Sequence, residues 1–300
     1  MIKSFEKLIG LAKSKGSKKL AVAVAEDHEV LEAVKMATEL KLIKPTLVGD
    51  KEKIEAIAKE INFDLTKTKI IDEKDQVLAA REATRLVSSG ECNILMKGLV
   101  PTVTIMKQVL DKEIGLRTEK IISHVAVFHA KNYHKVFFVT DAAMNIAPDL
   151  NGKKGIIENA VDLAHSLDIK IPKVAVLAAS EKVSPKMEST VHAEELVSLY
   201  KNGEIKNCVV DGPFALDNAI SKEAAKVKGI DSEVAGNPDI LLVPNIDAGN
   251  VLYKSLTFLA DADSAGIILG TKAPIVLTSR TDNKEAKLHS IALGVLLASK

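Results

Sequence analysis

The sequence has no tryptophan, and aromatic residues make up only 3% of its 300 residues. Single-stranded nucleic acids are bound on aromatic side chains that stack with the bases, so this chain has little material for such a platform. Its 41 lysines and arginines nearly balance its 40 aspartates and glutamates, and no long block of either charge stands out. Because a polyanion needs a strongly basic surface, we expect no nucleic-acid partner.

Cysteine and long apolar runs are also scarce. Cys92 and Cys208 lie far apart in apolar surroundings, with no Cys-x-x-Cys spacing and no Cys-His cluster of the kind that binds zinc. No apolar run approaches the roughly 20 residues of a membrane span. Residues 1–19 mix lysines with single apolar residues, unlike a signal peptide. The sequence therefore predicts a cytoplasmic protein with buried cysteines and no membrane partner.

Apolar runs alternate with segments of helical period along the whole chain. This alternation is typical of parallel strands joined by crossover helices, so the predicted class is α/β. Strands are expected at 19–25, 46–48, 70–71, 94–96, 122–128, 136–140, 174–177, 208–211, 240–243, 266–269 and 275–278. Helices are expected at 27–40, 51–59, 75–88, 102–111, 155–167, 186–201, 218–226, 251–261 and 283–298. A chain of this length predicts two domains of about 150 residues.

The polar cluster after residues 274–277 carries the strongest chemical signal. A short apolar run leads into Thr278-Ser-Arg-Thr-Asp282, where an amphipathic helix is expected to begin. Arg280 offers a planar fork of donors for phosphate or carboxylate, Ser279 adds a hydroxyl, and the first amides of the helix add a positive dipole end. The segment predicts an anion site. The alternative is a helix N-cap followed by a solvated arginine.

Two further polar segments follow predicted strands, and ligands of open parallel sheets bind outside the carboxyl ends of the strands. Lys97 supplies a point charge and Gly98 permits close backbone approach. Asp141 and Asn145 bound a tight loop of small residues, and Asn145 can donate to a carbonyl or phosphate oxygen. Equally, Lys97 fits a surface lysine in a turn, and the loop pair fits side chains that bond only to their own backbone.

A third candidate segment contains Gly249, Asn250 and Lys254. We expect Gly249 and Asn250 to open a helix, where exposed amides bind anions, with Lys254 one turn further along on the same face as Asn250. Glycine before a helix is also ordinary turn chemistry. A separate turn, Asp211-Gly-Pro-Phe-Ala-Leu-Asp217, carries a pair of carboxylates.

The ordered set of these segments resembles the phosphate acyltransferases, which exchange phosphate and coenzyme A on an acyl group. The matching pieces are Asp141-Ala-Ala-Met-Asn145, Asp211-Gly-Pro-Phe-Ala-Leu-Asp217, Pro244-Asn-Ile-Asp-Ala-Gly-Asn-Val-Leu-Tyr-Lys254 and Thr278-Ser-Arg-Thr-Asp282. Their order is more specific than any one of them. The chain length and the amino-acid sequence of residues 277–287 most resemble the butyryl branch of this family, and the acetyl branch is its near neighbour.

The resemblance implies a two-domain α/β fold with parallel sheets, similar to the isocitrate and isopropylmalate dehydrogenases, with the active site in the cleft between domains. The first domain would comprise residues 1–127 completed by 276–300, and the second residues 128–275. Ser279 and Arg280 would then line one wall, and the loops at 141–145 and 249–254 the other.

The resemblance also implies the reaction: butyryl-CoA and phosphate give butyryl phosphate and coenzyme A, reversibly, without a metal or redox cofactor. In the acetyl branch the serine and arginine contact the acyl phosphate, and an aspartate seven residues beyond the serine is implicated as the base. This chain has Ala286 there, so Asp282 or Glu285 would have to serve. Arg280 would hold the phosphoryl oxygens, and Ser279 with Asn145 would donate to the oxyanion. The expected substrate-binding residues are Lys97, Gly98, Asp141, Gly249, Asn250 and Lys254.

Three alternatives stay open at this point. One is acetyl transfer, and another is a metal-dependent 2-hydroxy-acid dehydrogenase, although the aspartate spacing that would hold its metal is missing. The last is a coenzyme A-binding module that has lost its base. A homo-oligomer is expected from the resemblance and from apolar helix residues such as 291–297.

Overall fold

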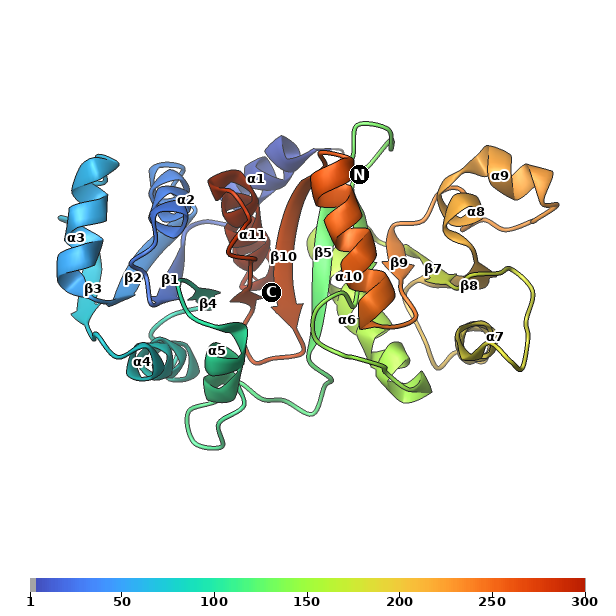
Figure 1. Ribbon diagram of the computed structural model, residues 1–300, viewed down its shortest axis with the longest axis horizontal. Coiled ribbons are helices and arrows are strands. Elements are labelled where there is room, and N and C mark those ends of the chain that lie inside the picture. Colours follow the sequence, from blue (N-terminus) through green and yellow to red (C-terminus); the bar gives the residue numbers. More distant parts are fainter. Residues whose placement is uncertain (1–3, 300) are drawn as a thin grey trace. The chain divides into compact units, whose positions relative to one another are not determined.

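A computed structural model describes residues 4–299 and shows a mixed α/β protein (Figure 1). The α/β class predicted from the sequence is confirmed. The chain divides into two compact units, of which one comprises Ile121–Asp263 and the other joins Phe5–Lys120 to the segment that starts at Ser264. We call them the inserted unit and the terminal unit.

The terminal unit contains the following elements: α1 Phe5–Ser14, β1 Lys18–Ala23, α2 His28–Glu39, β2 Ile43–Gly49, α3 Lys51–Glu60, β3 Lys69–Asp72, α4 Gln76–Ser88, β4 Ile94–Lys97, α5 Thr102–Val109, β10 (Asp263–Leu269, from Ser264 on), β11 Ile275–Val276 and α11 Lys284–Leu297. Its strands lie in the order β3-β2-β1-β4-β11-β10. All neighbouring pairs are parallel except β10 and β11.

Strands β1 and β4 mark the topological switch point of the terminal unit. The chain runs outward from β1 to β2 and β3, then returns to place β4 on the other side of β1. Helix α2, which follows β1, and α5, which follows β4, consequently lie on opposite faces of the sheet (Figure 1). A crevice forms between the carboxyl ends of two such strands, and this is where open α/β sheets bind ligands.

The inserted unit contains β5 Ser123–His129, β6 Phe137–Thr140, α6 Leu150–Ser166, β7 Lys173–Leu177, α7 Glu188–Lys201, β8 Val209–Phe214, α8 Leu216–Ile220, α9 Lys222–Val227, β9 Ile240–Leu242, α10 Ile246–Lys254 and the π-helix Ser255–Leu259. Its strands lie in the order β5-β6-β9-β7-β8, and only the β5–β6 pair is antiparallel. Helices α6 and α10, which follow the adjacent strands β6 and β9, lie on opposite faces (Figure 1). The ends of β6 and β9 therefore form a second switch point.

Short polar side chains start the helices at the edge where the parallel strands end. Asp27 accepts a hydrogen bond from Val30 N (2.9 Å), and Asp50 and Asp75 cap α3 and α4 in the same way. Such caps stabilise a helix by about 1 kcal/mol each. The apolar run at 20–25, which includes most of β1, is fully buried, as expected for a strand that is covered on both faces of the sheet.

Several details of the predicted elements were wrong. Among the described strand pairs within each unit, β10–β11 and β5–β6 are antiparallel, whereas only parallel pairs were expected. Helix α1 was missed, although Phe5, Leu8 and Ala12 form its buried stripe. The helix expected at 218–226 is split at Ser221, whose hydroxyl caps α9.

Burial bears on three other predictions. Both cysteines are free and buried, as expected, and burial raises the pKa of the Cys208 thiol to about 11. Residues 291–296 are buried within the terminal unit, so these apolar side chains give no support to an oligomer. Over the part of the chain that the structure describes, every helix is too short or too polar to span a bilayer.

Candidate active site

Lys97 is the last residue of β4 and lies at the switch point of the terminal unit. It pairs in register with Ala23 at the end of β1, and the neighbouring Met96 pairs with Val276 of β11. The segment after β11, with Ser279 and Arg280, therefore leaves the sheet at the same edge as Lys97. Two predicted site segments, about 180 residues apart in sequence, are brought together here by parallel pairing.

Gly98 is required by packing. Its N–H donates to Ala23 O (2.9 Å), and a Cβ at this position would lie 2.2 Å from Val24 O and 2.7 Å from Ala23 O. The following Leu99 N–H donates to Val24 O at 2.7 Å. The backbone after β4 is thus fixed against the end of β1, as the predicted close approach at this glycine requires.

Lys97 is only 4% exposed, so the surface lysine that the sequence also allowed is excluded. Burial is the main cause that lowers the pKa of Lys97 to about 8, and the positive charges of Arg280 and Lys287 add to it. The carboxylates of Asp27 and Asp282 act in the opposite direction. We call Lys97, Arg280 and Lys287 the basic cluster.

Residues 279–282 form a turn that is stabilised by hydrogen bonds among its own residues and from the side chain of Lys287. Ser279 N–H donates to Asp282 Oδ2 at 2.7 Å, and the Ser279 and Thr281 hydroxyl oxygens are 2.9 Å apart. The side chain of Lys287, 3% exposed, donates to the backbone oxygens of Ser279 (3.4 Å) and Asp282. Ser279 and Arg280 therefore sit on a braced turn, which suits groups that must meet a ligand in a fixed geometry.

Arg280 is exposed, and the described residues give its guanidinium no hydrogen bond or ion pair. The N-cap of α11 is Asn283, which accepts from Ala286 N at 2.9 Å, so Ser279 is not a cap. The capping alternative for Ser279 is therefore wrong. Glu285 lies exposed in the first turn of α11.

Asp141 organises the loop after β6 at the switch point of the inserted unit. Its Oδ1 accepts from Ala143 N (2.9 Å) and Met144 N (3.0 Å), and its Oδ2 accepts from Asn145 N (3.2 Å). The side-chain amide of Asn145 donates to Asp141 Oδ2 at 2.6 Å and to Ile122 O at 2.9 Å. Both amide hydrogens of Asn145 are thus committed, one to Asp141 within the loop and one to the backbone just before β5.

The start of α10 differs from the prediction. The helix begins at Ile246 with Asn245 as its N-cap, so Gly249 and Asn250 lie in its second turn and do not open it. Gly249 is required by contact: a Cβ would lie 2.8 Å from Asp141 O and 2.9 Å from Ala142 Cα. Helix α10 is therefore packed directly against the Asp141 loop.

The other predicted residues of α10 point outward. Asn250 is exposed, and the Lys254 ammonium lies 5.2 Å from the Tyr253 ring centroid and 5.5 Å from that of Phe258. These rings favour a cation at that position.

The carboxylates of the 211–217 segment are used structurally. Residues 211–214 belong to β8 and do not form the expected turn. Asp211 accepts from Gly212 N (2.8 Å) and from the Ser232 hydroxyl, and Asp217 is paired with Lys228 (3.1 Å). We assign neither to the site.

The similarity to known proteins extends along the whole chain. The family model described as phosphate acetyl/butaryl transferase matches residues 4–83 and 76–295. A phosphate butyryltransferase of Clostridium beijerinckii is 51% identical over 300 residues, covering 100% of this chain and 99% of the relative. The chain belongs to this family.

Two other similarities refine the membership. A phosphate acetyltransferase of Thermotoga maritima is 47% identical over 98% of this chain and 99% of its own. A branched-chain phosphotransacylase from Enterococcus faecalis, solved as a crystal structure, superposes with a TM-score of 0.83 at 36% identity, covering 94% of this chain and 99% of that one.

The expected likeness to dehydrogenases is confirmed at the level of the fold. A 4-hydroxythreonine-4-phosphate dehydrogenase from Klebsiella pneumoniae gives a TM-score of 0.56 at 14% identity, covering 94% of this chain and 99% of that chain. At this identity the likeness concerns the fold alone.

Lys287 was not predicted from the sequence as a residue of the candidate site. It lies next to Ala286, in a helix whose period alone would have assigned it to an ordinary buried face. A lysine among the apolar positions of α11 was the available signal, because lysine is rarely buried without a partner.

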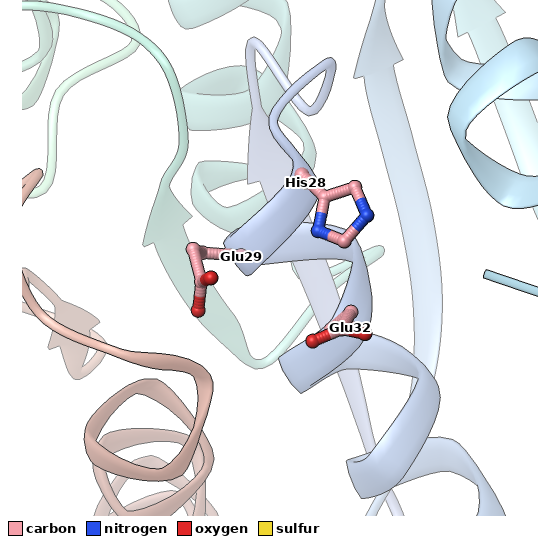
Figure 2. Close-up of side chains that lie close together, drawn as sticks. All are labelled: His28, Glu29 and Glu32. Atoms are coloured by element: carbon pink, nitrogen blue, oxygen red, sulfur yellow. The ribbon is translucent and has the colours of Figure 1, made fainter. Parts of the chain in front are cut away.

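A cluster of three possible metal ligands lies on α2, near the start of α11. His28, Glu29 and Glu32 project from its first turns (Figure 2), with ligand atoms within 4.8 Å of one another. Glu32 is paired with Lys284 at 2.7 Å, and this hydrogen bond is the main cause that lowers the pKa of Glu32. The ion pair accounts for the cluster, and we assign it no metal.

Proposed function

We propose that this chain is a phosphate butyryltransferase, which converts butyryl-CoA and phosphate into butyryl phosphate and coenzyme A, reversibly. The observation that carries the proposal is the 51% identity with a relative of that name over the full length of both chains. The basic cluster beside Ser279 at the end of the sheet supports it, because the reaction needs a site for phosphate and acyl phosphate.

Arg280 is proposed to hold the phosphoryl oxygens. Its guanidinium is exposed and has no ion-pair partner among residues 4–299, so its donors are available to an oxyanion without displacing a protein carboxylate. Ser279 is proposed to donate its hydroxyl to the oxygen that becomes negative in the tetrahedral intermediate. Its backbone is held by Asp282 and Lys287, so the hydroxyl is positioned before the substrate arrives.

Asn145 is proposed to act by position, not as a donor to the oxyanion. Both hydrogens of its amide are donated to Asp141 Oδ2 and Ile122 O, so a third bond would require one of these to break. Together with Asp141, it holds the loop after β6 in one conformation. Gly249, which packs on that loop, serves the same purpose.

The remaining substrate contacts stay predictions. Lys97 and Gly98 at the end of β4, and Asn250 and Lys254 on α10, are proposed to contact phosphate or coenzyme A. Coenzyme A is a substrate, and neither a metal nor a redox cofactor is required by the proposed chemistry. We also propose that the protein works in the cytoplasm as a homo-oligomer.

Acetyl transfer is the second candidate, because a relative named phosphate acetyltransferase is 47% identical over 98% of the chain. One or two methylenes of acyl chain are worth only about 1 to 3 kcal/mol of discrimination, so the two activities differ by a modest change in pocket depth.

The test is thiol release from acetyl-, propionyl- and butyryl-CoA by the purified protein, with and without phosphate. We expect release that depends on phosphate and has the highest kcat/KM with butyryl-CoA. A preference for acetyl-CoA would move the assignment to the acetyl branch. Absence of phosphate-dependent release with all three thioesters would contradict acyl transfer, and titration with coenzyme A would then test for a binding module.

A further inference from the structure

We propose that Lys97 is the proton acceptor for the coenzyme A thiol, in place of the carboxylate that the chain lacks at Ala286. The inference rests on the proposed function, because it assigns one step of that reaction. A free thiol has a pKa of about 8.5, and only the thiolate is a competent nucleophile, so the thioester-forming direction needs a base.

The first support is the way in which Lys97 is buried. Lys135, 1% exposed, is paired with Asp239 at 2.5 Å and also donates to Asn237 O at 3.0 Å. Lys97 is as deeply buried, yet the one hydrogen bond that the described residues give its ammonium is to Gly98 O, at 3.2 Å. An ammonium has three hydrogens to donate, and an unpaired buried charge is unfavourable. Burial at this site therefore makes Lys97 easier to deprotonate than an exposed lysine.

On balance, the charged groups around Lys97 also leave its pKa below that of an exposed lysine. Arg280 and Lys287 oppose a further positive charge, whereas Asp27 and Asp282 favour it. However, Asp27 is engaged by Val30 N as the cap of α2, and Asp282 is engaged by Ser279 N. Neither carboxylate forms a direct ion pair with Lys97, and the pKa of about 8 leaves roughly a tenth of the amine neutral at pH 7.

The two carboxylates that the sequence suggested are less suited to this role. Asp282 is 7% exposed and holds the turn through the Ser279 amide, so a proton on it would weaken that bond. Glu285 is exposed to solvent in the first turn of α11. Lys97 is the last residue of β4, at the switch point of the terminal unit, which is where open α/β sheets bind ligands.

The proposed step balances without any further reactant. Neutral Nζ of Lys97 accepts the S–H proton, and the sulfur forms a bond to the carbonyl carbon of butyryl phosphate. The tetrahedral intermediate collapses, the carbon–oxygen bond to phosphate breaks, and its electron pair leaves with the phosphate. The ammonium of Lys97 then returns the proton to a phosphate oxygen, so that butyryl-CoA and hydrogen phosphate are released. In the reverse direction the ammonium protonates the departing thiolate.

The test compares the full-length protein with Lys97→Met and Glu285→Gln in the thioester-forming direction, from about pH 6 to 10. We expect kcat/KM of the unchanged protein to rise with pH through a limb near pH 8. Lys97→Met should lose about a hundredfold or more in kcat at pH 7, because a general base contributes about 10² to 10⁴. Its remaining activity should rise only with the ionisation of the coenzyme A thiol itself, whose pKa is about 8.5. Glu285→Gln should keep the limb. Lys107→Met, at an exposed position on α5, is the matched control and should behave like the unchanged protein.

Two further measurements separate a base from an anion ligand. By calorimetry, Lys97→Met should lose much less in affinity for coenzyme A and phosphate than it loses in kcat. A selenol analogue of coenzyme A ionises without a base, so it should restore much of the turnover of Lys97→Met.

A kcat at pH 7 that Lys97→Met leaves unchanged, or a loss of turnover that the selenol does not relieve, would overturn the proposal. So would disappearance of the limb in Glu285→Gln. If the unchanged protein shows no phosphate-dependent acyl transfer, the proposed function fails, and that result is distinct from the failure of Lys97 as its base.

Discussion

The carboxylate of Asp282 accepts a hydrogen bond from the backbone N–H of Ser279, three residues earlier, at 2.7 Å. This contact holds the first of the two residues proposed to meet the acyl phosphate. It also gives Asp282 a structural role, because one oxygen of its carboxylate already fixes the turn.

Substitution of Asp282 is expected to affect both fold and catalysis. Asp282→Ala leaves the Ser279 amide without its acceptor, and a lost charged hydrogen bond costs about 1.5 to 3 kcal/mol. Urea unfolding should show that loss of stability, and kcat should fall as well because Ser279 is released. A variant with reduced kcat but unchanged stability would contradict the bracing role and would return Asp282 to the candidates for a base.

Ser279→Ala is expected to reduce kcat about a hundredfold or more without changing stability. Ser279 is half-buried, and among residues 4–299 its hydroxyl contacts only Thr281, through the Thr281 hydroxyl (2.9 Å) and backbone N–H (3.4 Å). Removing one oxyanion donor typically costs that much in turnover. Steady-state kinetics beside circular dichroism would check this, with Thr281→Ala as the neighbouring control. Equal losses in the two variants would favour a structural role for the hydroxyl pair.

Arg280→Lys should raise KM for phosphate more than it lowers kcat. A lysine keeps the charge but cannot form the two parallel hydrogen bonds of a guanidinium. The expected loss of kcat/KM is about tenfold to a hundredfold, from a bond worth about 1.5 to 3 kcal/mol. Phosphate saturation curves in the thioester-consuming direction would measure it. An unchanged KM would remove Arg280 from the phosphate site.

The lowered pKa of Lys97 also predicts how the stability of the protein depends on pH. Its pKa in the folded protein is about 8, below the 10.5 of an exposed lysine, so the unfolded chain binds more protons between these two values. The stability should therefore rise with pH through this window, and the full penalty should be present below about pH 8. For a shift of this size the penalty is on the order of 3 kcal/mol.

Urea unfolding from about pH 7 to 10 would check this prediction, with Lys97→Met against Lys107→Met. Lys97→Met should be more stable than the unchanged protein at pH 7, and the difference should shrink toward pH 10. A difference that does not depend on pH would mean that Lys97 keeps its charge in the fold.

Gly249→Ala should damage the inserted unit through the Asp141 loop. The new methyl group would lie 2.8 Å from both Asp141 O and Val243 Cγ2, so the backbone must shift, at a cost of about 1 to 3 kcal/mol. Gly10→Ala is the matched control, because Gly10 lies inside α1 with no atom within 4 Å of the added carbon. That change should stabilise by up to about 1 kcal/mol. Equal effects of the two substitutions would show that the contact at Gly249 is unimportant.

Sequence alone predicted the strand ends well, because buried parallel strands are continuous apolar runs and their polar successors stand out. That is why Lys97, Asp141 and Ser279 were found as candidates. Start points of helices were harder: the glycine at 249 drew attention, although Asn245 carried the capping signal. Gly249 faces a loop more than a hundred residues earlier in the chain, and no local pattern encodes such a contact.

The burial of Lys97 was out of reach for a related reason. A lysine between a strand and a glycine is typical of a surface position. The positive charges that lower the pKa of Lys97 include those of Arg280 and Lys287. Those residues come from a helix and a turn that follow β4 by some 180 positions. The altered chemistry of Lys97 is a property of the pairing between β4 and β11, which a sequence specifies only through the whole fold.

That pairing has a consequence for how the protein is made. β11 follows β4 by about 180 residues and leaves the ribosome well after it, yet β11 lies between β4 and β10 in the sheet of the terminal unit. Until β11 and the segment after it have been made, the inner edge of β4 has no partner and Ser279 and Arg280 do not yet exist beside Lys97. The nascent chain cannot consume acyl-CoA under this proposal, and a ribosome that stops before residue 275 releases a chain with an open strand edge, the kind of surface that chaperones and proteases recognise.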